Sequence, residues 1–127
     1  MIDHVSLQVR DLAASTAFYT HILEPLGYRR LIERPASVGF GTKYPELWLN
    51  ARPDMTLLPP GSGAHVCLRA RSADAVGEFH RRAVAVGAAD DGSPGPRQAS
   101  MVTYYAAFIC DVDGNRIEVM TVPTQGS

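Results

Sequence analysis

The sequence predicts an α+β fold in which two paired βαβββ modules form a curved sheet around a cavity. Two observations support this prediction: the order of the expected elements and an internal repeat. A strand-like run, a helical pattern and three further strand-like runs occur in the first half of the 127 residues, and the second half begins in the same way. His65 falls on His4 and Phe79 falls on Phe18 at an offset of 61 residues. Each module would have a helix on one sheet face, so two modules can enclose a cavity between the bare faces.

The first half contains clear signals for where its helix begins and ends. Asp11 suits the N-cap of the helix, and Pro25 and Gly27 end it. Breakers around Pro35 and Pro45 separate the short strand-like runs that follow. The elements expected here are a strand over 2–9, a helix over 12–23, and strands over 28–33, 37–41 and 46–50.

The second half repeats this order after a connection rich in proline and glycine. We expect one domain, with a first module over about 1–52, a connection over 53–63 and a second module over about 64–122. Ser72 suits the N-cap of the second helix, which Gly87 ends. Residues 104–120 form two apolar runs around an Asp/Gly/Asn turn, which predicts a β-hairpin. Residues 90–100 are expected to be an irregular loop that covers the mouth of the cavity.

Composition and charge exclude several classes of protein. The chain is 46% hydrophobic and 20% charged with a net charge of -1, whereas a nucleic-acid-binding protein usually has a basic excess or stripe. We find no secretory signal and no apolar run long enough to cross a bilayer, so no membrane partner is expected and a cytoplasmic protein is the default. Cys67 and Cys110 lie in strand-like runs and are expected to be reduced, buried thiols.

Glu118 is a carboxylate in the middle of an apolar strand, where an unpaired charge would be costly to bury. Alternation places it on the bare face of the second module. The side chains expected on the two bare faces are His4, Ser6, Gln8, Glu46, Trp48, Asn50, His65, Cys67, Arg69, Glu118 and Met120. Two imidazoles and one or two carboxylates in this set suit a divalent transition metal. The alternative is that His4 is a hydrogen-bonded strand histidine and that Glu118 is solvated on an open face.

Several short segments of the chain resemble the vicinal oxygen chelate superfamily, which includes glyoxalase I, bleomycin-resistance proteins, fosfomycin-resistance enzymes and extradiol dioxygenases. These segments are Ile-Asp-His-Val at 2–5, Phe-Tyr at 18–19, Leu-Gly at 26–27, Ala-His-Val at 64–66 and Asp-Val-Asp-Gly-Asn-Arg-Ile-Glu at 111–118. The resemblance implies paired βαβββ modules around a divalent metal such as Zn, Ni, Mn or Fe. It also implies a small substrate that binds the metal through two oxygens.

The resemblance assigns ligand positions residue by residue. His4, His65 and Glu118 match the metal ligands of the superfamily, and Glu46 matches a fourth ligand of its glyoxalase-like members. Glu46 also follows a proline at a strand start, where an exposed glutamate is common. The superfamily's fosfomycin-resistance enzymes use three protein ligands, so a site without Glu46 is also consistent with the resemblance.

Four further residues are candidates for binding the substrate. Tyr104 and Phe108 share the face that the resemblance implies is the cavity, and the Tyr104 hydroxyl suits a donor to the substrate. Trp48 can stack on a ligand, although aromatic residues in strands more often belong to the core. Arg97 can pair with an anionic group, although exposed arginines usually only solvate a surface.

The leading functional hypothesis is a metal-dependent glyoxalase-like enzyme of the lyase or isomerase type. In this mechanism class the metal stabilises an enediolate or alkoxide oxygen, and Glu118 or Glu46 moves a proton. A non-catalytic small-molecule or drug-binding protein, like the bleomycin-resistance members, is the alternative. An Fe(II) dioxygenase using His4, His65 and Glu118 is a weaker option, because such enzymes usually carry more modules.

The connection over 53–63 is long enough to let the two modules pair with those of a second chain. We therefore expect a homodimer, an arrangement that is frequent in the families that the chain resembles. Each metal site would then take His4 from one chain and His65 with Glu118 from the other. A two-fold partner would cover both the strand edges and the bare faces of the separated modules.

Overall fold

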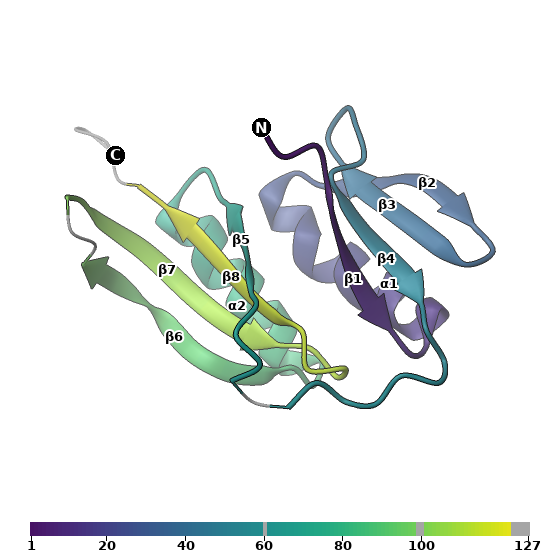
Figure 1. Cartoon of the computed structure of the whole chain (residues 1–127). Coiled ribbons are helices and arrows are strands. Elements are labelled where there is room, and N and C mark those ends of the chain that lie inside the picture. Colours follow the sequence, from purple (N-terminus) through teal and green to yellow (C-terminus); the bar gives the residue numbers. More distant parts are fainter. Residues whose placement is uncertain (60, 99–100, 123–127) are drawn as a thin grey trace.

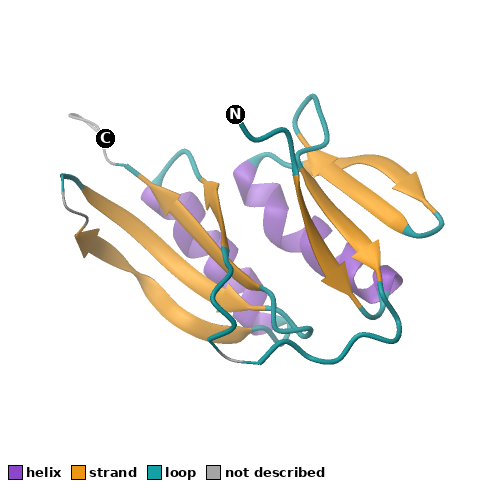
Figure 2. Ribbon diagram, in the orientation of Figure 1, coloured by secondary structure: helices purple, strands orange, loops and turns teal. Residues whose placement is uncertain are grey.

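Two four-stranded sheets, each with a helix on one face, make up the fold (Figure 1; Figure 2). A computed structural model describes residues 1–59, 61–98 and 101–122. The elements are β1 (Val5–Val9), α1 (Leu12–Leu23), a short 3-10 helix η1 (Glu24–Leu26), β2 (Arg29–Arg34), β3 (Ser37–Gly41), β4 (Leu47–Ala51), β5 (Val66–Arg69), α2 (Ala73–Ala85), β6 (Ala89–Gln98), β7 (Thr103–Cys110) and β8 (Arg116–Thr121). The predicted α+β class with paired βαβββ modules is confirmed.

The two sheets have the same topology, as the internal repeat requires. Their strand orders are β1-β4-β3-β2 and β5-β8-β7-β6. β1 runs parallel to β4 and β5 runs parallel to β8, and all other neighbouring strands are antiparallel. We refer to them as sheet 1 and sheet 2. Because the repeated sequence forms the same ladder twice, corresponding residues occupy corresponding positions in both sheets.

Side-chain capping fixes the start of each helix where the sequence predicts it. Asp11 Oδ1 accepts a hydrogen bond from the Ala14 amide at 3.0 Å, and Ser72 Oγ accepts one from the Ala75 amide at 3.1 Å. Gly27 has a φ of 81°, a left-handed conformation that glycine adopts without steric cost, and the chain turns there toward β2. Within the described part of the chain, no helix is both long and apolar enough to span a membrane.

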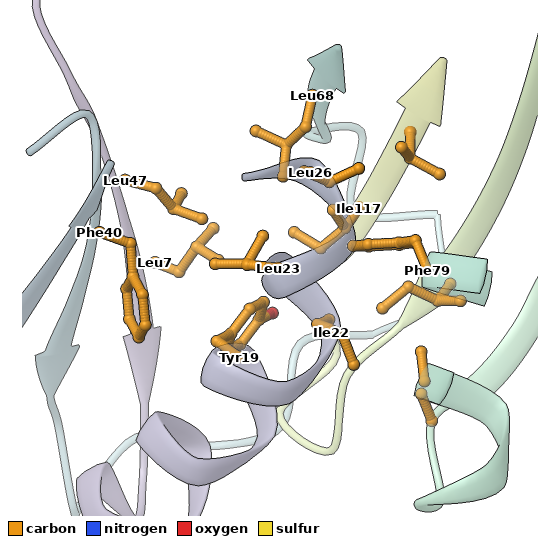
Figure 3. Packing of buried hydrophobic residues seen from close by; sticks show 14 of the residues in the cluster. Leu7, Tyr19, Ile22, Leu23, Leu26, Phe40, Leu47, Leu68, Phe79 and Ile117 are labelled. Atoms are coloured by element: carbon orange, nitrogen blue, oxygen red, sulfur yellow. The ribbon is translucent and has the colours of Figure 1, made fainter. Parts of the chain in front are cut away.

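A single apolar core joins the two modules. In Figure 3, Leu23 and Ile22 of α1 lie between the inner face of sheet 1 and the side chains of Ile117 and Phe79 from the second module. All four side chains are fully buried. The helices therefore pack against each other as well as on their own sheets, and the modules lie side by side with β1 and β5 as the neighbouring edges (Figure 1).

A buried polar network at the turn before β8 also holds the modules together. Asp111 accepts hydrogen bonds from the Tyr19 hydroxyl at 2.6 Å, from the Asn115 amide at 2.8 Å and from the Asn115 side-chain amide at 3.0 Å. Asp113 pairs with Arg10 Nε at 2.7 Å. Both aspartates are buried. The most specific segment of the family resemblance thus has a structural task, which is to dock the second module on the β1–α1 junction.

The expectation of an irregular loop over residues 90–100 is wrong. Most of this segment belongs to β6, which pairs along its length with β7, and it forms no lid; the last two residues lie outside the described part. β6 is an edge strand, where prolines such as Pro94 and Pro96 are tolerated because one side of the strand needs no partner. Register shifts around Gly92 absorb the irregular spacing.

Candidate functional site

His65 and Glu118 form a direct pair on the open face of sheet 2. His65 lies just before β5, and Glu118 lies in the neighbouring strand β8, opposite Cys67 in the ladder. His65 Nε2 and Glu118 Oε1 are 3.0 Å apart. The Glu118 side chain is 8% exposed and that of His65 37% exposed. The sequence predicted that these residues would meet, and the pairing of β5 with β8 explains why they do.

Cys67 lies beside this pair and is not the buried thiol that we expected. It is exposed because strand alternation places it on the same open face as His65. Desolvation of the sulfur and, after it, the nearby Glu118 carboxylate, which repels a thiolate, together raise the pKa of the Cys67 thiol to about 12. The thiol therefore remains protonated at neutral pH although solvent reaches the residue.

We expect Cys67 to be alkylated by iodoacetamide roughly tens of times more slowly at pH 8 than an unperturbed thiol, because the thiolate is the reactive form. The rate should rise as the pH approaches about 12. Glu118→Gln should accelerate the reaction, since it removes the repelling charge. Mass spectrometry on a Cys110→Ser background measures Cys67 alone, and equal rates with Glu118 and with Gln at this position would contradict the explanation.

Phe108 forms an apolar wall next to the His65–Glu118 pair. It is the ladder partner of Glu118, and its ring centroid is 5.9 Å from that of His65. Two guanidinium groups lie over the Phe108 ring, with Arg116 Cζ at 4.6 Å and Arg97 Cζ at 6.0 Å from the centroid. Arg116 also pairs with Asp91. Sequence reasoning missed Arg116, although its alternation with Glu118 along β8 is the signal that places both on one face.

Tyr104 and Arg97 are less available to a ligand at this pair than the sequence suggested. Tyr104 lies four residues from Phe108 on β7, which is about 13 Å along an extended strand. The guanidinium of Arg97 donates to the carbonyl oxygens of Gly95 and Ser93 at 3.0 and 2.9 Å. Arg97 is therefore held by its own strand, and Tyr104 is not a neighbour of Glu118.

The other two proposed metal ligands lie near the edge of sheet 1. His4 Nδ1 is 2.7 Å from Asp3 Oδ1 on the exposed N-terminal segment. Glu46 Oε2 accepts a hydrogen bond from the Tyr28 hydroxyl at 2.8 Å. Burial first, and then the Glu46 contact, raise the pKa of Tyr28 to about 12. His4, Glu46 and Cys67 line a hollow of ≈ 220 Å³ between the β1 and β5 edges.

The four proposed metal ligands therefore form two groups within one chain. His4 and Glu46 belong to sheet 1, and His65 and Glu118 belong to sheet 2. Among residues 1–59, 61–98 and 101–122, no three His, Cys, Asp or Glu side chains converge in a way that could hold a metal ion. The donor chemistry of the His65–Glu118 pair fits a divalent metal, because one imidazole nitrogen and one carboxylate oxygen already converge there.

The open face of sheet 1 carries a second group of polar and aromatic side chains. Trp48 is half-buried in the middle of this face, and the Arg34 Cζ atom is 5.2 Å from the indole centroid. These residues, together with His4 and Asn50, line a hollow of ≈ 340 Å³. Sequence reasoning selected Trp48 but missed Arg34, because nothing local distinguishes Arg34 from Arg29 and Arg30 on the same strand.

The comparisons with known proteins agree with this architecture. The family model described as the Glyoxalase/Bleomycin resistance protein/Dioxygenase superfamily matches residues 1–119. A search of curated proteins finds no match. The solved structures that resemble the chain include a glyoxalase/bleomycin resistance protein from Albidiferax ferrireducens, with 24% identity, a TM-score of 0.83, and coverage of 94% of this chain and 97% of that chain.

Two more distant structures extend the comparison. The fosfomycin resistance protein FosX from Listeria monocytogenes has 17% identity and a TM-score of 0.69, covering 98% of this chain and 95% of that chain. TioX from a Micromonospora species has 16% identity and a TM-score of 0.64, covering 95% of each chain. At these identities the structural similarity establishes the fold alone.

Proposed function

Because the chain belongs to the glyoxalase/bleomycin resistance protein/dioxygenase superfamily, we propose that it is a metal-dependent, glyoxalase-like enzyme that acts on a small oxygen-chelating substrate. The observation that carries this proposal is the contact of 3.0 Å between His65 Nε2 and Glu118 Oε1 on an open sheet face. Such a pair is a suitable half of a site for Zn, Ni, Mn or Fe. In this proposal His4 is the third ligand and Glu46 the fourth.

The geometry supports a site that is shared between two chains. His4 belongs to sheet 1 and is exposed, whereas the His65–Glu118 pair belongs to sheet 2. Within a single chain, the open faces carry half-buried or exposed groups such as Trp48, Phe108 and Met120. A homodimer in which the sheet 1 face of one chain covers the sheet 2 face of its partner buries these groups and brings His4 to the pair.

The residues of this chain have distinct tasks in the proposed reaction. A bound divalent metal supplies Lewis-acid chemistry, which polarises an oxygen of the substrate. In this proposal Glu118 would hold or transfer a proton at a carboxylate oxygen, and Phe108, its ladder partner, would exclude water from that side. Glu46 can act as a second base only after it releases the Tyr28 hydroxyl.

Metal analysis of the purified protein tests the proposal directly. We expect close to one divalent metal per chain in the wild type, and a loss of at least about tenfold in metal affinity in His65→Ala, because one of only a few ligands is removed. His80→Ala is the matched control, since His80 pairs with Asp90 on the other side of the sheet. An unchanged metal content in His65→Ala would contradict the assignment of this site.

Non-catalytic binding of a small molecule is the second candidate function. It is favoured by the donor count within one chain, because no third His, Cys, Asp or Glu side chain joins the pair among the described residues. A protein that stays metal-free after incubation with Zn²⁺, Ni²⁺, Mn²⁺ and Fe²⁺, and still binds small molecules, would support this function over the enzyme.

A further inference from the structure

We propose that the open face of sheet 1 recognises an anionic group and a planar group of the substrate, with Arg34 binding the anion and Trp48 forming a platform for the planar part. This inference rests on the proposed function, because it places the metal-chelating oxygens of the same substrate at the His4 end of this face. It adds a substrate class: an elongated organic anion, such as a carboxylate attached to a flat ring.

The Trp48 indole packs closely against the backbone of β3. Its ladder partner is Gly39, and a methyl group added at that glycine would lie 3.0 Å from Trp48 Cη2 and 2.9 Å from Pro45 Cβ. These distances are too short for a Cβ atom at residue 39. Because Gly39 has no side chain, the indole can lie close to the backbone of β3. A ring packed in this way loses little conformational freedom when a ligand stacks on it, and the planar group of the ligand takes the place of the Arg34 guanidinium, which lies over the ring and moves to its edge to bind the anion.

Arg34 is a cation that the described part of the protein does not neutralise. The guanidinium of Arg116 pairs with Asp91, and that of Arg10 pairs with Asp113. Among the residues with described positions, by contrast, no carboxylate lies within ion-pair distance of Arg34, which is held over the Trp48 ring instead. A stacked guanidinium keeps its N–H groups available for a carboxylate, which binds them in a two-pronged geometry.

The strand register gives the dimensions of the ligand. Arg34, Ser37 and Asn50 are aligned across β2, β3 and β4, so a hydroxyl and an amide lie at the same level of the sheet as the guanidinium. The next level contains Trp48 and Ser6, and His4 lies one level further. Two levels correspond to four residues of a strand, or about 13 Å.

The ligand must therefore be elongated to use the whole face. Its negative group lies on the order of 10 Å from the oxygens near His4, with a flat part between them over Trp48. The hollow of ≈ 340 Å³ that contains both His4 and Arg34 accommodates a molecule of this size. A neutral molecule of the same shape would leave the guanidinium without its partner.

The fluorescence of Trp48 provides the test, since it is the single tryptophan of the chain. Metal-free protein is titrated with 3-phenylpropionate and, in parallel, with 3-phenylpropionamide, its neutral counterpart. We expect saturable quenching with the carboxylate and a dissociation constant at least about tenfold larger with the amide, because a charged hydrogen-bonded pair is lost.

Variants of two arginines on β2 identify the group responsible. Arg34→Gln should weaken binding of the carboxylate about tenfold and leave binding of the amide unchanged, and Arg34→Lys should restore only part of the affinity. Arg30→Gln is the matched control: it makes the same charge change on the same strand, but Arg30 is aligned with the buried Phe40 on the opposite face. Its titration should equal that of the wild type.

The same titration in Glu118→Gln separates this inference from the proposed function. If the Arg34 effect persists in that variant while the metal analysis fails, the anion site stands and the metal-dependent enzyme is rejected. Three outcomes would overturn the anion site, whatever the metal analysis shows. They are indistinguishable titrations of Arg34→Gln and Arg30→Gln, equal binding of the carboxylate and the amide, and no saturable quenching with either probe.

Discussion

Replacing Asp111 with alanine should lower the free energy of unfolding by about 3–5 kcal/mol, because several buried donors lose their acceptor at once. Asp111 accepts hydrogen bonds from the Tyr19 hydroxyl, from two backbone amides and from the Asn115 side chain. The hydroxyl and the carboxylate come from different modules, 92 residues apart in the sequence. Urea unfolding followed by circular dichroism measures the change.

Two further variants show whether a loss of stability in Asp111→Ala comes from its buried hydrogen bonds. Tyr19→Phe removes one donor and keeps the ring in the core, so it should cost about 1–2 kcal/mol. Asp54→Ala changes an exposed carboxylate in the connection and should stay within about 0.5 kcal/mol of the wild type. If Asp111→Ala is no less stable than Asp54→Ala, the turn does not hold the modules together.

Mixing a His4→Ala chain with a Glu118→Ala chain should restore metal binding that neither chain has alone. If each site takes His4 from one chain and His65 with Glu118 from the other, half of the randomly formed dimers are mixed and each has one intact site. Recovery should therefore reach about a quarter of the wild-type metal content. The two chains are unfolded together, refolded and analysed for metal after size-exclusion chromatography.

The control for this experiment is a single chain that carries both substitutions. This chain is refolded with wild-type chain. If the sites lie within single chains, each mixed dimer has one intact site and one site that lacks both ligands. If the sites are shared, each of the two sites in a mixed dimer lacks one ligand. A mixture of the two single variants that is clearly dimeric and binds no metal would place the sites within single chains. A monomer by light scattering would remove the shared site altogether.

The features that the sequence predicted correctly depend on few neighbouring residues. Each helix begins where the side chain of Asp11 or Ser72 caps the first free amides, a contact that spans three residues. Alternation along a strand put His65 and Glu118 on one face, and the repeat aligned the strand that follows His65 with the strand that follows His4. Local hydrogen bonding and periodicity were enough for these predictions and for the fold, whereas the family was indicated by the resemblance of several short segments to the superfamily.

Other features were decided by contacts between distant segments. β6 is a strand in spite of its glycines and prolines, because β7 supplies hydrogen bonds along an edge that tolerates them. Glu46 bonds to Tyr28, which no alternation pattern indicates. The position of Arg34 over Trp48 depends on the register of three strands and on the irregularity between Arg30 and Ile32 in β2.

The sequence by itself thus determined which residue types this protein presents on its two open faces, because the side-chain direction in a strand follows from position alone. Only the tertiary structure decided which of these residues meet. Strand register, edge pairing and the docking of one module on the other set those distances, and each depends on free energies summed over segments that are far apart in the chain.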